Sequence, residues 1–88
     1  MGKMRDKRVF EDFLFKKWKQ LAYSYENNGD VVISKNFVKD GNEYCIIARF
    51  SKEENYCGGY VCNSSGEAII NGRGFDIDEF IDFIKLIK

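Results

Sequence analysis

One run of the chain, residues 44–50, constrains the fold most because its alternate positions are apolar on both sides. The apolar residues fall on two sides of an extended strand: Tyr44, Ile46, Ala48 and Phe50 on one, Cys45 and Ile47 on the other. Turn-forming residues bound the run at both ends. A strand that can be buried on both sides belongs in the middle of a sheet, so we predict that Tyr44–Phe50 is the central strand.

The segments around this run predict the other elements. Apolar residues recur every three or four positions over Lys7–Glu26 and over Ile77–Ile87, which predicts two amphipathic helices. Between them, runs rich in β-branched and aromatic residues predict four strands: Asp30–Val38, Tyr44–Phe50, Tyr56–Cys62 and Glu67–Ile70. The Asp40-Gly41 pair predicts a tight hairpin after the first strand. The 88 residues therefore predict one α+β domain, an antiparallel β-meander in the order α-β-β-β-β-α, with residues 1–6 as a flexible basic tail.

The apolar character of the central strand leaves two arrangements of the helices open. If the helices cover opposite faces of the sheet, the protein is self-contained. If they share one face, Cys45 and Ile47 lie on a face that needs another cover, such as a second copy of the chain. Phe15, Tyr23 and Leu86 fall outside the apolar stripes of the predicted helices and are compatible with a homodimer. Single apolar residues are nevertheless common on protein surfaces, so both arrangements stay open.

A glycine-rich turn, Gly72-Arg73-Gly74, precedes the second predicted helix and offers backbone N–H groups to a phosphate. Asp76 and Glu79, three residues apart, have the spacing of a capping box. Their negative charge would repel an anion and already complements the helix dipole. We interpret this segment as a tight turn followed by a helix cap.

Three cysteines and the absence of histidine limit the chemistry of the chain. Zinc sites usually need four ligands, so Cys45, Cys57 and Cys62 are interpreted as small buried side chains in a reducing compartment. We predict no metal site and no cofactor. No apolar run is long enough to span a bilayer, and no apolar secretory segment follows Met1. The sequence thus predicts a cytoplasmic protein without a membrane partner.

The distribution of carboxylates argues against an enzyme. Without histidine, a nucleophile would have to pair with a lysine or a carboxylate. The carboxylates fall in predicted turns and on solvent faces, and a domain of this size has little room for a catalytic cleft. We therefore predict no catalytic residues and no enzymatic activity.

The leading functional hypothesis is a small non-enzymatic intracellular binding protein that docks on a protein partner. The composition is rich in Lys, Asn, Ile, Phe and Tyr and lacks proline, which is common in AT-rich bacteria and their phages. This favours an inhibitor or adaptor of the phage or mobile-element type. If the partner is a nucleic-acid enzyme, acidic side chains could occupy its basic channel as phosphate mimics. The candidate residues for this contact are Glu53, Glu54, Asp78 and Asp82.

The alternative hypothesis is single-stranded nucleic-acid binding by the basic first helix. Fourteen basic and fourteen acidic residues balance overall, but residues 1–19 hold seven of the basic and three of the acidic ones. The cations and aromatics on the outer face of this predicted helix are Arg8, Phe15, Lys16, Lys19 and Tyr23. Arg49 and Arg73 could contact phosphate elsewhere.

Two segments, Glu43–Phe50 and Gly72–Glu79, together resemble the end of bacterial PC4-like single-strand DNA-binding domains. Those domains close a four-stranded meander with a Gly-basic-Gly turn and a helix, and they dimerise. The resemblance implies a sheet-plus-helix architecture, nucleic-acid binding and a homodimer for this chain. The chain departs from that pattern in its leading helix, in the segment Cys57–Ile70 and in lacking a basic, Trp-containing second strand.

Overall fold

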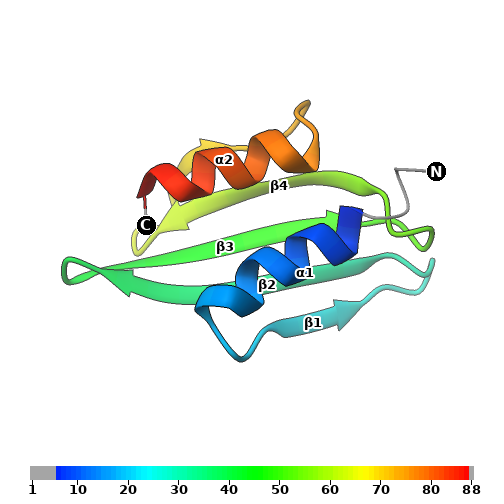
Figure 1. Ribbon diagram of the computed structural model, residues 1–88, viewed down its shortest axis with the longest axis horizontal. Helices are drawn as coiled ribbons and strands as arrows, with labels where there is room; N and C mark the ends of the chain where they lie inside the picture. The colour runs from blue at the N-terminus through cyan, green and yellow to red at the C-terminus, as the bar shows by residue number, and fades with distance from the viewer. Residues whose placement is uncertain (1–5, 88) are drawn as a thin grey trace.

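Two helices and a five-stranded antiparallel sheet make up residues 6–87, the part of the chain that the computed structural model describes (Figure 1). The elements in chain order are α1 (Asp6–Lys17), β1 (Ala22–Tyr25), β2 (Val31–Lys39), β3 (Asn42–Phe50), β4 (Tyr56–Asn63), β5 (Ala68–Asn71) and α2 (Ile77–Ile87). The sheet order is β1-β2-β3-β4-β5, so strands pair with their neighbours in sequence. The predicted α+β meander with flanking helices is therefore confirmed. Asp6 begins α1, and the rest of the predicted tail, residues 1–5, lies outside the described residues.

The prediction of four strands and of a long first helix over Lys7–Glu26 is wrong in one place. α1 ends at Lys17, and Ala22–Tyr25 forms β1, an edge strand paired with residues 31–34 of β2. The Tyr-Ser-Tyr sequence of β1 suits a strand, and pairing with β2 satisfies its backbone groups, which outweighs the helical spacing of its apolar residues. Trp18, directly after α1, packs its ring 5.1 Å from that of Phe37 and so holds the chain as it turns to the sheet edge.

The hairpin between β2 and β3 follows the prediction from the sequence. Lys39 pairs with Asn42, and the two residues between them have positive φ angles, 54° at Asp40 and 81° at Gly41. Two such residues in a two-residue loop match the twist of the strands that they join. The predicted central strand lies within β3, which is the middle strand of the sheet.

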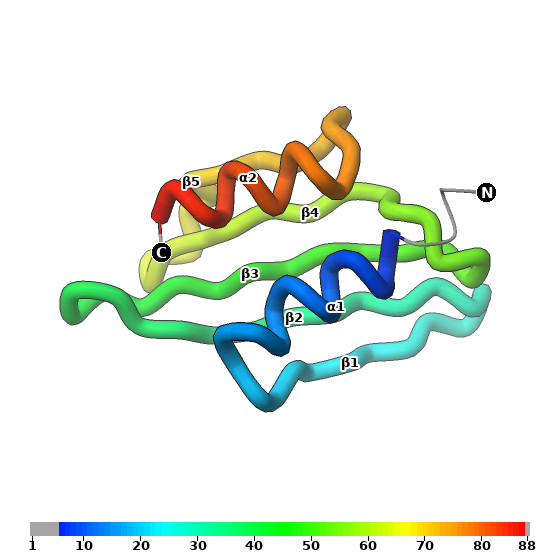
Figure 2. Tube along the Cα trace, in the orientation of Figure 1, coloured from blue at the N-terminus to red at the C-terminus, as the bar shows by residue number. Residues whose placement is uncertain are grey.

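Both helices cover the same face of the sheet, with α1 across β2 and β3 and α2 along β4 (Figures 1 and 2). The ring of Phe10 in α1 lies 6.1 Å from that of Phe80 in α2 and 5.5 Å from that of Phe50 in β3. The buried core consists of Phe10, Leu14, Val31, Ile33, Phe37, Ile46, Ala48, Phe50, Val61, Ile77, Phe80, Ile81 and Ile84. Of the two arrangements that the sequence leaves open, residues 6–87 adopt the one in which neither α1 nor α2 covers Cys45 and Ile47.

Hydrogen bonds fix the start of α1 against the β3–β4 connection. The Asp6 carboxylate accepts a hydrogen bond from the backbone N–H of Tyr56 at 2.9 Å, and the N–H of Lys7 donates to the carbonyl of Glu54 at 3.2 Å. These contacts join segments that are far apart in the sequence and orient α1 over the sheet. Within residues 6–87, neither helix has the length and apolar character that crossing a bilayer requires.

The capping box predicted for α2 is present. The N–H of Asp76 donates to the Glu79 carboxylate at 3.1 Å, and the N–H of Glu79 donates to the Asp76 carboxylate at 3.0 Å. We expect Asp76→Ala to lower the free energy of unfolding by about 1 kcal/mol, because it removes an acceptor from the first turn of the helix. Urea unfolding measures this loss, and Asp82→Ala, at an exposed position of the same helix, is the matched control. Equal losses for the two variants would contradict the capping role.

Candidate functional site

The face of the sheet opposite the helices, called the open face from here on, is the candidate functional site. The strand register arranges its side chains in rows across the sheet. The rows are Ser24, Val32, Arg49 and Gly58; then Ala22, Ser34, Ile47, Tyr60 and Asn71; then Asn36, Cys45, Cys62 and Ala68; and last Val38 and Glu43. The central strand β3 therefore contributes one residue to every row.

The two middle rows of the open face contain no charged residue, although 32% of the chain is charged. Charge lies only in the outer rows, with Arg49 in the first and Glu43 in the last. Two lysines of β2, Lys35 and Lys39, fall on the helix side by the alternation of the strand. Tyr60 is 41% exposed and supplies the largest apolar surface at the centre. The open face is thus uncharged in its middle and polar at its ends.

A shallow hollow of about 780 Å³ lies over one end of the open face. Val32, Ile47 and Tyr60 line it with apolar surface, and Arg49 and Arg73 add positive charge. A smaller hollow of about 350 Å³ lies at the other end, where Glu43 contributes a negative charge. The open face is therefore uneven, with oppositely charged groups in its two hollows.

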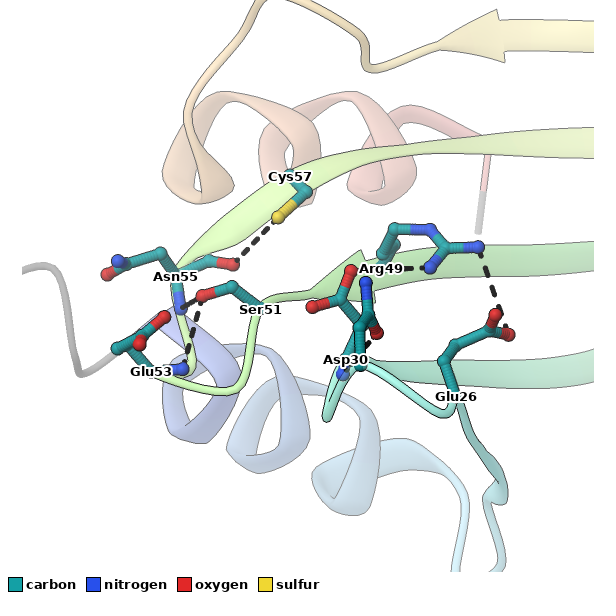
Figure 3. A network of polar contacts seen from close by, with 8 residues as sticks. Glu26, Asp30, Arg49, Ser51, Glu53, Asn55 and Cys57 are labelled. Carbon is teal, nitrogen blue, oxygen red and sulfur yellow. Dashed lines mark hydrogen bonds and ion pairs between the residues drawn. The ribbon is translucent and has the colours of Figure 1, made fainter.

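A polar network surrounds Arg49 at the edge of the larger hollow (Figure 3). Its guanidinium lies 3.5 Å from the Asp30 carboxylate and 3.9 Å from the Glu26 carboxylate. All three groups are at least partly exposed, so each ion pair stabilises the fold by at most about 1 kcal/mol. The two carboxylates nevertheless neutralise Arg49 locally. A phosphate approaching this hollow would meet a cation that is already paired twice.

The predicted acidic docking residues lie away from the open face, on two separate elements. Glu53 and Glu54 are in the β3–β4 connection, and Asp78 and Asp82 are on α2. Hydrogen bonds hold this connection. The Ser51 hydroxyl accepts a hydrogen bond from the N–H of Glu53 at 3.2 Å, and the N–H of Glu54 donates to the Ser51 carbonyl at 2.7 Å. Both hydrogen bonds are made to Ser51, one to its side chain and one to its carbonyl, and together they fix the shape of the connection.

The residues predicted for nucleic-acid binding do not share one helix face. Arg8, Phe15 and Lys16 are exposed on α1, whereas Lys19 follows the helix and Tyr23 lies on β1. The interpretation of one continuous helical face is wrong because α1 ends at Lys17.

Tyr23 is moreover already engaged. Its hydroxyl donates to the Glu11 carboxylate, and the Lys7 ammonium lies 5.8 Å from its ring centroid. Burial and the neighbouring Glu11 carboxylate raise the pKa of Tyr23 well above its ordinary value. A base that stacks on Tyr23 would have to replace the lysine over its ring.

Sequence reasoning missed the open face as a site, although it marked Cys45 and Ile47. The overlooked signal is that the central residues on one side of three neighbouring strands are uncharged. These residues are Ser34 and Asn36 on β2, Cys45 and Ile47 on β3, and Tyr60 and Cys62 on β4.

In residues 6–87, no three side chains of His, Cys, Asp and Glu gather closely enough to hold a metal ion. Comparison with protein-family models, with curated proteins and with solved structures finds no match to the chain.

Proposed function

We propose that this protein is a small non-enzymatic binding protein of the cytoplasm, an inhibitor or adaptor of the phage or mobile-element type, that docks on a protein partner through the open face. The observation that carries the proposal is the pair of charge-free middle rows on a face that neither α1 nor α2 covers. Protein interfaces are depleted of charge at their centre, enriched in tyrosine and polar at the rim. The open face has this distribution, with Tyr60 at its centre and Arg49 and Glu43 in its outer rows.

The dimensions of the open face support docking on a protein. The nine residues of β3 extend over about 30 Å and five strands over about 19 Å, which gives roughly 600 Å² in projection. One side of a standard protein interface buries about 800 Å² of accessible surface. The partner that fits best has an uncharged centre, an acidic group to face Arg73 and a basic group to face Glu43.

Electrostatics favour a protein over a nucleic acid on this face. Phosphate binding needs several unpaired cations, and most of the affinity for nucleic acid comes from them. Arg49 is paired with Glu26 and Asp30, and among the described residues of the strands no lysine lies in the rows of the open face. Arg73 adds a single further cation to the larger hollow, so the nucleic-acid alternative rests mainly on Arg8, Lys16 and Lys19 near α1. An oligonucleotide titration at two salt concentrations tests it, and binding that falls steeply with salt would support it.

We expect Tyr60→Lys to abolish binding of the partner, because it places a charge at the uncharged centre of the interface. The wild-type protein, immobilised and exposed to host extract, identifies the captured protein, and the purified partner is then titrated against each variant. Leu86→Lys is the matched control, since Leu86 is 80% exposed on α2 and far from the open face. Equal affinity for the two variants would overturn the proposal.

Two further outcomes separate the alternatives. A variant in which Glu53, Glu54, Asp78 and Asp82 are replaced by Asn tests phosphate mimicry; loss of binding there, with full binding by Tyr60→Lys, would move the docking site to those acidic residues. Sedimentation of the wild-type protein alone tests a homodimer. A dimer that Tyr60→Lys converts to a monomer would identify a second copy as the protein that covers the open face.

A further inference from the structure

Two of the three cysteines face each other across the two central strands of the open face. Cys45 on β3 pairs directly with Cys62 on β4, and both side chains are half-buried. We propose that Cys45 and Cys62 form a dithiol site that a low-molecular-weight disulfide, such as glutathione disulfide, converts to an intramolecular disulfide linking β3 to β4.

The strand register places the two cysteines directly opposite each other. Residues directly opposite in an antiparallel pair have Cα atoms about 4.5–5.5 Å apart, and their side chains point to the same face. A disulfide needs Cα atoms about 4.4–6.8 Å apart, and residues paired in this register fall within that range. The Cys45 sulfur has a weak contact, at 3.9 Å, with the Ile46 carbonyl oxygen, and its thiol also interacts with that of Cys62.

Cys57 is not a competitor within the folded protein. It lies at the other end of the open face, where its thiol donates to the Asn55 carbonyl at 3.5 Å. Gly58, its neighbour, is four residues from Cys62 along β4, which corresponds to about 13 Å. That separation exceeds the reach of a disulfide. Cys57 is exposed, so the prediction of three buried cysteines is wrong for this residue. Because glutathione disulfide can reach it, Cys57 is replaced by serine in the experiments below.

The reaction balances with one molecule of glutathione disulfide. One protein thiolate attacks a sulfur of glutathione disulfide, which breaks the S–S bond and releases one glutathione thiolate. The second protein thiolate then attacks the protein sulfur of the mixed disulfide. This step forms the Cys45–Cys62 bond and releases a second glutathione thiolate. The protein loses two electrons and two protons, and glutathione disulfide becomes two molecules of glutathione.

The environment of the pair makes this reaction slow at neutral pH. Burial, together with the neighbouring Cys62, raises the pKa of the Cys45 thiol above its ordinary value. Below its pKa, the thiol is ionised to a small extent, and its thiolate fraction rises about tenfold for each pH unit. Because the thiolate is the reactive form, the oxidation rate should rise by about tenfold between pH 7 and pH 8. We therefore expect the dithiol to react slowly with glutathione disulfide near neutral pH.

Oxidation would also alter the docking surface, and this part rests on the proposed function. Cys45 and Cys62 occupy one of the two charge-free rows, so a disulfide changes the shape at the centre of the open face. It also closes the loop between β3 and β4, which should raise the midpoint of thermal unfolding by about 10 °C or more. If the oxidised protein does not bind a captured partner differently, only the docking consequence fails. The mass experiment below stands by itself.

The test uses the full chain with Cys57→Ser. After incubation with glutathione disulfide, intact mass spectrometry should show the loss of two hydrogen atoms, and peptide mapping should find Cys45 linked to Cys62. Replacing Cys62 by Ser in the same chain should instead leave a stable glutathione adduct on Cys45. Two retained thiols, or two stable glutathione adducts on the Cys57→Ser protein, would overturn the proposal.

A displaced thiol is the matched control. In a chain with Cys57→Ser, Cys62→Ser and Tyr60→Cys, the second thiol stays on β4 and on the same face, diagonal to Cys45. Diagonal residues are about 7–8 Å apart, too far for a disulfide. This chain should gain glutathione adducts without an internal disulfide. If it closes as fast as the Cys45–Cys62 pair, strand register is not what makes the pair reactive.

Discussion

Phe10→Ala should leave the protein close to its unfolding threshold at 25 °C. The side chain is fully buried, and its ring packs against Phe80 of α2 and Phe50 of β3, so it joins three elements of the core. Removing a buried phenylalanine costs about 3–5 kcal/mol through lost transfer energy and the cavity that remains. Small domains have total stabilities of about 5–15 kcal/mol, so this loss removes a large share.

Phe15→Ala is the matched control for Phe10→Ala. Phe15 lies on the same helix but is 46% exposed, so its truncation should change the free energy of unfolding by less than about 1 kcal/mol. Urea titration followed by circular dichroism measures both variants. Similar losses would mean that α1 does not cover the sheet through Phe10.

Gly59→Ala should destabilise the protein by about 3 kcal/mol, the upper end for overpacking a core. A Cβ atom at Gly59 would lie 2.6 Å from the backbone carbonyl oxygen of Ile47 and 2.8 Å from Cε2 of Phe80. The first contact is with the backbone of β3 and cannot be relieved by a rotamer change. Either the pairing of β3 with β4 or the position of α2 on the sheet must therefore shift.

A double-mutant cycle tests whether Phe80 carries part of this strain. In Gly59→Ala with Phe80→Leu, the smaller side chain removes one of the two clashes, so the combined loss should be smaller than the sum of the single losses. Thermal and urea unfolding of the four proteins give the coupling energy. Strict additivity would show that the strain lies in the contacts with the β3 backbone, at Ile47 and Ala48, and not in the contact with Phe80.

The parts of the fold that the sequence predicts well depend on local chemistry. Asp40-Gly41 forms its hairpin because both residues accept positive φ, and α2 begins at a capping box whose two members are close in sequence. β1 could not be recognised in this way. Ala22–Tyr25 is short and continues the helical spacing of α1, and only the edge of β2 makes it a strand.

The open face could not be predicted because it depends on where the helices lie. Alternation along β3 shows that Cys45 and Ile47 share a face, but the choice of covered face is made by contacts such as Phe10 with Phe80. The pairing of Cys45 with Cys62 depends further on the length of the β3–β4 connection and on the irregular register at Arg49 and Phe50. Such tertiary features depend on contacts between distant segments and cannot be predicted from any short segment of the sequence.

The neighbour-to-neighbour order of the strands has a consequence for how the chain is made. Hairpins between β2, β3 and β4 can form as soon as their residues leave the ribosome, because their contacts are local. Phe10, in contrast, is fully packed only after Phe80 of α2 has been synthesised. During synthesis, the part of the apolar side that α2 covers, along β4, thus stays exposed until α2 emerges. The nascent chain is therefore most prone to aggregate or to bind a chaperone after β4 has been synthesised and before α2 has followed it.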